Sequence, residues 1–265
     1  MPRVTVDGIG VAYADTGGSG PALVLIHGWP FNSSLWDPQV EKLSDRARIV
    51  AMDLMGFGAS DAPDDPARYS MAAFADQVRS VIDDAGLDRV VLGGLSMGGY
   101  VCFEMWRRHR DVIRALVLAD TRAEADTPES LEKRTTQQAQ VRAEGIAPVA
   151  EALLESLLSE ATRSRKPNVV ARVRAVMENP PQGYVGGLEA MKRREDSTGD
   201  LVTIDVPALV IVGEHDGITP PAVARTMHEH IGGSQLVVVR EAGHVSNLEG
   251  ADDFNRAVSG FLAGL

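Results

Sequence analysis

Residues 90–99 read Val90-Val91-Leu92-Gly93-Gly94-Leu95-Ser96-Met97-Gly98-Gly99. An apolar run ends here in glycines, and a helical pattern follows, which is typical of a strand that turns sharply into a helix. Gly94 to Gly98 match G-x-S-x-G, a pattern in which the serine lies on a strained turn with its hydroxyl exposed. Glycines are needed where such a turn crowds its own backbone. The stretch therefore predicts a nucleophilic Ser96 at the start of a helix, whose dipole favours negative charge nearby.

On both sides of this stretch, short apolar runs alternate with longer amphipathic segments. The runs lack polar alternation, as do strands buried on both faces of a parallel sheet; they are residues 22–26, 49–52, 90–92, 115–119, 208–212 and 236–239. The amphipathic segments predict helices over residues 71–85, 97–110, 220–231 and 251–262. Asp7-Gly8 is a hairpin signal between two short strands near the start. We expect an α/β fold with a mostly parallel central sheet and helices on both faces.

One block interrupts this alternation. From about residue 121 to residue 200 no strand-like run occurs, and the pattern is helical with glycine and proline punctuation. We therefore expect a core domain made of residues 1–120 and 201–265, and a helical cap, or lid, made of residues 121–200. The cap is close to neutral, whereas the core holds most of the net charge of −11. An anionic ligand would be repelled less by the cap than by the core.

Composition excludes several classes of protein. The 265 residues are 44% hydrophobic and 24% charged, which is ordinary for a globular chain and not for a disordered one. The net charge of −11 disfavours binding to nucleic acid. No apolar stretch approaches the roughly 18 residues of a membrane helix, and the start lacks the apolar region of a signal peptide. Since Cys102 is the single cysteine, no intrachain disulfide forms, and a cytoplasmic protein is expected.

A serine hydroxyl becomes a nucleophile only beside a base that an acid orients. Among the six histidines, His244 directly follows the last predicted strand, at its carboxyl end. Ligand sites of open parallel sheets lie at these ends, so His244 is the predicted base. His27 also follows a buried strand, but it precedes Gly28 and is interpreted as a brace for that loop.

Two aspartates compete for the role of the acid. Asp216 lies at the carboxyl end of the strand before His244, and it is the predicted acid. Asp120, directly after another predicted strand, is the main alternative, with a cap of the following turn as its structural role; Glu214 and Asp53 are weaker candidates. The chain order serine, aspartate, histidine is the one expected for a serine on a strand-to-helix turn.

The tetrahedral intermediate of acyl transfer needs two backbone N–H donors. The amide of Met97, directly after the serine, is the first predicted donor. The amide of Trp29 is the second, because it lies in the loop after residues 22–26 and the next residue, Pro30, has no N–H. We expect Trp29 and Phe31 to line an apolar substrate pocket and Arg122 to contact substrate. Simple core packing is the alternative for the side chains of Trp29 and Met97.

Signatures of cofactor and metal sites are absent from the sequence. There is no G-x-G-x-x-G, no P-loop lysine, no H-E-x-x-H and no cysteine pair. The two histidines of His228-Glu229-His230 would point to different faces of a helix. Neither a cofactor nor a metal is expected.

Taken together, these residues resemble the α/β-hydrolase superfamily over nearly the whole chain. The matching pieces are His27-Gly28-Trp29-Pro30, residues 53–60, the turn around Ser96, Gly213-Glu214-His215-Asp216 and Gly243-His244. The resemblance implies a hydrolase. Haloalkane dehalogenases and epoxide hydrolases of this fold use an aspartate as nucleophile, so the serine argues against both.

Within the superfamily the resemblance divides between subgroups. Residues 243–249 and 180–184 look like 3-oxoadipate enol-lactonases and related carboxylesterases. Residues 27–30 look more like esterases and cofactor-free haloperoxidases, which are perhydrolases. The expected function is that of a carboxylesterase acting on small, neutral, short-chain esters through an acyl-enzyme, with no partner other than the small-molecule substrate.

Three alternatives to this function stay open. An enol-lactone hydrolase would use the same catalytic residues. Because its substrate carries a carboxylate, it would need a basic residue in the pocket, such as Arg122, Arg134 or a member of the run 192–194. The other interpretation of these cations is that they lie on a solvated face. Perhydrolysis would be a side activity. A non-catalytic small-molecule receptor of the same fold is the alternative from another class. The sequence does not determine the oligomeric state.

Overall fold

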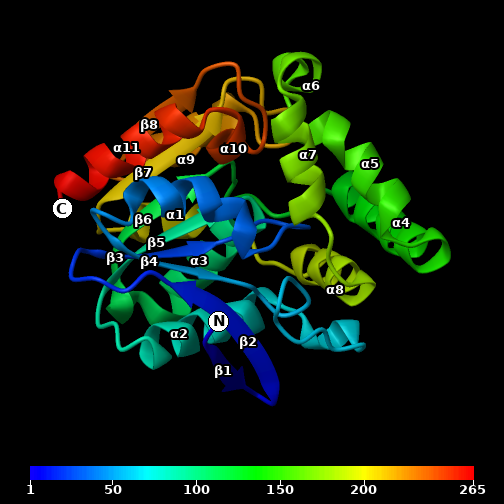
Figure 1. Cartoon of the computed structure of the whole chain (residues 1–265), viewed down its shortest axis with the longest axis horizontal. Helices are drawn as coiled ribbons and strands as arrows, with labels where there is room; N and C mark the ends of the chain where they lie inside the picture. The colour runs from blue at the N-terminus through cyan, green and yellow to red at the C-terminus, as the bar shows by residue number, and fades with distance from the viewer.

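One sheet of eight strands forms the centre of the computed structural model, which describes all residues from 1 to 265 (Figure 1). The strand order is β1-β2-β4-β3-β5-β6-β7-β8. The strands are β1 (Arg3–Val6), β2 (Ile9–Asp15), β3 (Ala22–Ile26), β4 (Arg48–Met52), β5 (Val90–Leu95), β6 (Ile113–Ala119), β7 (Ala208–Gly213) and β8 (Gln235–Val239). β2 pairs antiparallel with both β1 and β4, and every other pair is parallel, so the predicted, mostly parallel sheet is confirmed.

Helices cover both faces of this sheet. Figure 1 shows α1 and α11 together on one side and α2 and α3 on the other. The bounds of the core helices are α1 (Asp37–Leu43), α2 (Met71–Asp84), α3 (Met97–His109), α9 (Pro221–His230), α10 (Ser246–Glu249) and α11 (Ala251–Ala263). Short 3-10 turns are η1 (Ser33–Trp36), η2 (Pro66–Arg68), η3 (Arg110–Val112) and η4 (Thr198–Thr203).

Local sequence explains where the long helices begin. The side chain of Ser70 accepts a hydrogen bond from the amide of Ala73 at 3.1 Å and caps α2. Proline is the first residue of α9, where its missing N–H costs nothing. The helix α1 was not predicted, because it has seven residues and only two of them, Gln39 and Leu43, are buried.

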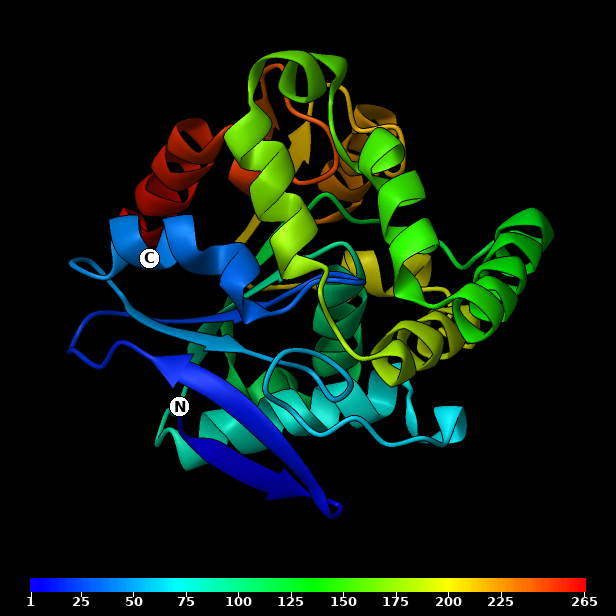
Figure 2. The ribbon, with the colours of Figure 1, turned by 45° about the vertical axis from the view of Figure 1, so that its right-hand side comes forward.

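Five further helices lie between β6 and β7 and are called the helical insertion here. They are α4 (Pro128–Glu144), α5 (Ile146–Leu157), α6 (Glu160–Arg165), α7 (Pro167–Val176) and α8 (Pro181–Lys192). Figure 2 shows them as a green to yellow group beside one end of the sheet. Buried side chains of the insertion, among them Val141, Leu153 and Leu188, belong to the same hydrophobic cluster as the sheet. The insertion is therefore packed onto the core.

None of the helices combines the length and the apolar character that crossing a membrane requires.

Candidate active site

The turn around Ser96 has the strained geometry that its sequence predicts. Ser96 joins β5 to α3 with φ 54° and ψ −113°, a conformation that residues with a Cβ rarely adopt. A Cβ on Gly94 would lie 2.2 Å from the carbonyl oxygen of Gly98, and one on Gly98 would lie 2.2 Å from that of Ile26. Both neighbours are backbone atoms that cannot rotate away. The glycines are therefore required by close backbone contacts.

Substitution of Gly94 by alanine is expected to destabilise the fold by about 3 kcal/mol or more, because the new methyl group overlaps the backbone of α3. Gly199→Ala is the matched control, since a Cβ there meets nothing within 4 Å. Urea unfolding of both variants gives the free energy of unfolding. Equal stability of the two variants would contradict this account of the turn.

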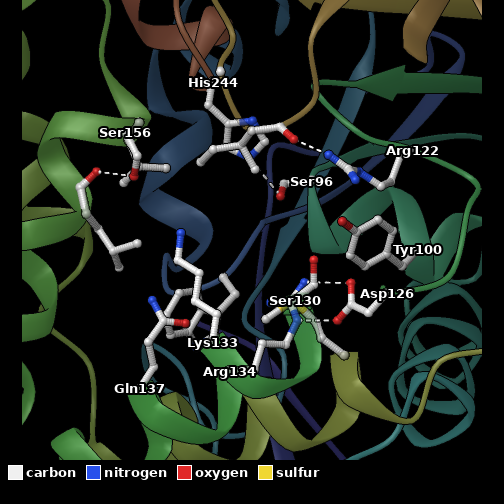
Figure 3. A pocket seen from close by; sticks show the side chains of 16 residues that line it. Ser96, Tyr100, Arg122, Asp126, Ser130, Lys133, Arg134, Gln137, Ser156 and His244 are labelled. Atoms are coloured by element: carbon white, nitrogen blue, oxygen red, sulfur yellow. Dashed lines mark hydrogen bonds and ion pairs between the residues drawn. The ribbon is translucent and has the colours of Figure 1, made fainter. Parts of the chain in front are cut away.

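Three side chains from the carboxyl ends of three strands meet beside this turn. The Oγ of Ser96 lies 2.8 Å from Nε2 of His244 (Figure 3). On the other side of the ring, Nδ1 of His244 lies 2.8 Å from Oδ2 of Asp216. Asp216 also accepts hydrogen bonds from the amides of Ile218 and Thr219 at 2.8 and 2.9 Å and from the Thr219 hydroxyl at 2.6 Å. The imidazole is therefore held between a hydroxyl and a fixed carboxylate.

Asp120 lies close to this array but has other partners. Its carboxyl group accepts hydrogen bonds from the amide of Gly213 at 2.8 Å and from the hydroxyl of Ser246 at 2.6 Å. No hydrogen bond joins it to His244. Complete burial and the nearby charge of Asp216 raise the pKa of Asp120 to about 8. Of the two aspartates considered from the sequence, the structure brings Asp216 to the imidazole.

Burial and charge act in opposite directions on the His244–Asp216 pair. Burial lowers the pKa of His244, but the Asp216 carboxylate and its hydrogen bond outweigh burial and leave this pKa raised. Burial raises the pKa of Asp216, while the His244 ring and the bonds from Thr219 lower it below its usual value. At neutral pH Asp216 is therefore a carboxylate that favours a proton on the imidazole.

The loop after β3 lies directly against Ser96. A Cβ on Gly28 would lie 2.9 Å from the backbone carbonyl oxygen of Leu95 and 3.2 Å from the Ser96 Cβ, so any larger residue would push this loop away from Ser96. The backbone N–H of Trp29, next in the chain, makes no hydrogen bond within the protein. Met97 is the first residue of α3, where helix amides lack an acceptor in the preceding turn. One backbone N–H from the loop after β3 and one from the first turn of α3 are thus close to the serine in the chain or in space.

A pocket of about 300 Å³ opens in front of the serine. Ser96, His244 and Trp29 line one end, and α4 and α5 of the helical insertion supply the opposite wall. The lining residues labelled in Figure 3 are Ser96, Tyr100, Arg122, Asp126, Ser130, Lys133, Arg134, Gln137, Ser156 and His244. This volume is at the lower end of the range for small-molecule sites. No group of three or more histidine, cysteine, aspartate or glutamate side chains is arranged to hold a metal ion.

Comparison with known proteins identifies the family of this chain. The family described as "alpha/beta hydrolase fold" has a model that matches residues 21–251. The chain belongs to the α/β-hydrolase family. Among solved structures, this α/β hydrolase is similar to a thermophilic esterase from Thermogutta terrifontis, with malate bound, at 36% identity and a TM-score of 0.95 over 100% of this chain and 99% of that one.

Enol-lactonases are a second group of similar proteins. The enol-lactonase from Burkholderia xenovorans LB400 is 33% identical, with a TM-score of 0.91, over 99% of this chain and 100% of that one. The 3-oxoadipate enol-lactonase 2 of Acinetobacter baylyi is 26% identical over 261 residues, which is 98% of this chain and 95% of the relative. The α/β hydrolase described here thus has both esterases and lactonases as relatives.

The residues predicted to bind substrate have different positions in this α/β hydrolase. Trp29 lines the pocket, and its indole donates to the carbonyl of Tyr184 at 3.1 Å. Arg122 also lines the pocket, where its guanidinium donates to the carbonyl of Ile218. Phe31 is fully buried in the core and does not line the pocket. The amide of Phe31 donates to the carbonyl of Gly28 at 2.9 Å, which closes a turn at this point of the chain.

The role expected for His27 agrees with its contacts. Its ring is completely buried, Nδ1 lies 2.9 Å from the Gly28 carbonyl oxygen, and Nε2 accepts the amide of Leu54 at 3.1 Å. Burial lowers the pKa of this imidazole. His27 therefore joins the loop after β3 to the loop after β4 and is not among the residues that line the pocket.

Glu249 has a part in the site that was not predicted from the sequence. Its buried carboxylate accepts the amide of Gly243 at 2.8 Å and the amide of Ser159 at 2.9 Å. The amide of His244 itself donates to the carbonyl of Leu157 at 2.8 Å. The His244 loop is thus bonded to the junction between α5 and α6. No local pattern could predict this contact, because Ser159 and Glu249 are 90 positions apart.

Proposed function

We propose that the chain is a serine hydrolase that cleaves carboxylic ester bonds of small molecules through an acyl-enzyme. The observation that carries the proposal is the continuous hydrogen-bonded array from the Ser96 hydroxyl through His244 to Asp216. A serine beside an imidazole that a carboxylate orients is the arrangement that makes an alcohol nucleophilic.

The proposed reaction has two halves. The Ser96 Oγ attacks the acyl carbon while His244 Nε2 accepts the hydroxyl proton, and the amides of Trp29 and Met97 donate to the oxyanion that forms. The bond to the alkoxy oxygen then breaks, and His244 gives its proton to the departing alcohol. In the second half His244 takes a proton from water, which attacks the acyl carbon; the bond to Ser96 Oγ then breaks, His244 returns the proton to Oγ, and the acid is released. Asp216 holds the imidazole throughout.

Lactone hydrolysis is the second candidate, and it needs no change in this machinery. The similarity to two enol-lactonases favours it, as does the presence of Arg122 in the pocket. In a lactone the departing alkoxide stays attached to the acid, so a single product is released. The choice between ester and lactone depends on the pocket rather than on the reacting side chains.

We also propose that residues 121–200 act as a cap on a core made of residues 1–120 and 201–265. Side chains from α4 and α5 line the pocket opposite Ser96, which supports this role. A cap in this position sets the size of the substrate and limits the access of water.

Fluorophosphonate labelling tests the proposal directly. We expect covalent attachment of one probe per chain at Ser96, because the probe reacts with activated serines and its phosphoryl oxygen needs an oxyanion site. Mass spectrometry of the labelled peptide identifies the residue, and a panel of esters of increasing acyl length, run beside 3-oxoadipate enol-lactone, then ranks the substrates. Failure to label would favour a non-catalytic receptor of the same fold.

A further inference from the structure

The wall of the pocket that faces Ser96 is polar. Ser130, Lys133, Arg134 and Gln137 of α4 all line the pocket, and their spacing of three and four positions puts them on one face of the helix. Figure 3 shows the Lys133 side chain extending from α4 into the pocket. An apolar ester would gain nothing from this stripe.

The carboxylate in the pocket lining is already neutralised. Asp126 pairs with the guanidinium of Arg134 and, at 2.5 Å, with that of Arg194. Each side-chain nitrogen of Arg134 has a partner, since Nε and Nη2 bond Asp126 and Nη1 lies 3.2 Å from the sulfur of Met191. Arg194 is almost completely buried and stacks over the ring of Tyr100 at 4.2 Å. This cluster therefore carries net positive charge and has no free carboxylate to attract another cation.

Lys133 differs from these arginines because it has no partner. Neither an ion pair nor a hydrogen bond to any residue of the chain involves its amino group. Arg122 is the other cation in the lining that has no carboxylate partner. It donates to the carbonyl of Ile218 and lies at the Ser96 end of the pocket, near His244. In a chain with a net charge of −11, the pocket lining has three cations and one carboxylate. The lining of this pocket is therefore cationic, although the chain as a whole is acidic.

We propose that Lys133 binds a carboxylate at the far end of the substrate, so that the preferred substrates are esters or lactones of dicarboxylic acids. This inference rests on the proposed hydrolase function. The ester carbonyl lies at Ser96, and the remote carboxylate lies against the Lys133 amino group, with the side chains of Ser130 and Gln137 as further hydrogen-bond donors. The preference differs from the neutral, short-chain esters expected from the sequence.

The charge on Lys133 acts at the mouth of the pocket, where solvent weakens it. Its side chain is exposed, so the attraction is that of a partly hydrated ion pair rather than of a buried one. The preference should therefore appear mainly in KM and should weaken as the ionic strength rises. Neutral esters should show no such dependence on salt.

Two substrates of matched length test this role of Lys133. Hydrolysis of monomethyl adipate and methyl hexanoate is followed by methanol release for the wild type and for Lys133→Gln, Lys133→Glu and Lys42→Gln. Lys42 is an exposed lysine on α1, outside the pocket lining, and its variant is the control. We expect Lys133→Gln to lower the ratio of kcat/KM for the anionic ester over the neutral one about threefold, and Lys133→Glu to lower it further.

The outcomes distinguish this inference from the proposed function. A ratio that is the same in the wild type, Lys133→Gln and Lys42→Gln, with both esters hydrolysed, would overturn the carboxylate site and leave the hydrolase intact. An equal fall for Lys42→Gln would mean that overall charge, not this pocket, sets the preference, and would also overturn it. No hydrolysis of either ester, together with no fluorophosphonate labelling, would overturn the proposed function and this inference with it.

Discussion

Ser96→Ala is expected to lower kcat/KM for ester hydrolysis by about 10⁵-fold, which is the largest effect of any single substitution considered. Without Oγ no acyl-enzyme forms, and the activity that remains comes from the oxyanion donors and from binding alone. KM should change little, because the hydroxyl contributes to the transition state and not to the pocket wall. Steady-state kinetics with an activated ester such as p-nitrophenyl acetate measure both constants.

The control for this variant is Ser164→Ala. Ser164 lies exposed on α6, its hydroxyl bonded to the carbonyl of Glu160 at 2.8 Å, and it does not line the pocket in front of Ser96. It should retain full activity and full labelling by a fluorophosphonate. Thermal unfolding shows whether Ser96→Ala is folded. A folded Ser96→Ala protein with more than a tenth of wild-type activity would refute Ser96 as the nucleophile.

Asp216→Asn is expected to lower kcat by about 10⁴-fold, since an amide at this position favours the wrong imidazole tautomer. Asp120→Asn is the matched control, because it replaces a second buried carboxyl group beside the same histidine. The raised pKa of Asp120, about 8, keeps that group protonated at neutral pH. An amide there keeps the shape and adds no charge, and the cost of replacing one accepting oxygen by NH2 falls on the bonds to Gly213 and Ser246 rather than on His244, so the loss should stay below about tenfold. The reverse order of effects would make Asp120 the acid.

The pH profile provides an independent readout of the same pair. Only the neutral imidazole accepts a proton, so activity is present above the pKa of His244 and is lost as the pH falls through it. Because Asp216 raises this pKa, the acid limb of kcat/KM in the wild type should lie above the ordinary value of about 6.5. Asp216→Asn removes that effect and leaves burial, so the limb should move to lower pH. An unchanged limb would contradict the coupling.

Much of the fold follows from patterns that are local in the chain. The apolar runs that became β3 to β8 are continuous, because both faces of the sheet are buried, and this pattern does not depend on distant residues. The turn at Ser96 is equally local. Its glycines avoid collisions with backbone atoms that lie within a few positions in the chain or on the adjacent strand. The position of His244 and Asp216 followed from the rule that strand ends gather at one edge of a parallel sheet.

Other features depend on contacts that no local pattern records. Phe31 was expected to line an apolar pocket together with Trp29, yet its side chain is buried in the core. Lys133 lies in a run of charges on α4 that looks like a solvated face, and only the placement of α4 opposite Ser96 gives it a ligand-binding position. Glu249 could not be assigned, because its partners come from the helical insertion and from the His244 loop.

The bonds that Glu249 and Leu157 make have a consequence for how this chain can be re-engineered. A chimaera that exchanges residues 121–200 as a block removes the amide that Glu249 accepts and the carbonyl that the His244 amide needs. Unless the incoming block presents the same two backbone groups in the same place, the base loses its support and turnover falls for every substrate. Replacing side chains on α4 leaves both bonds intact, and directed evolution of specificity should therefore begin there.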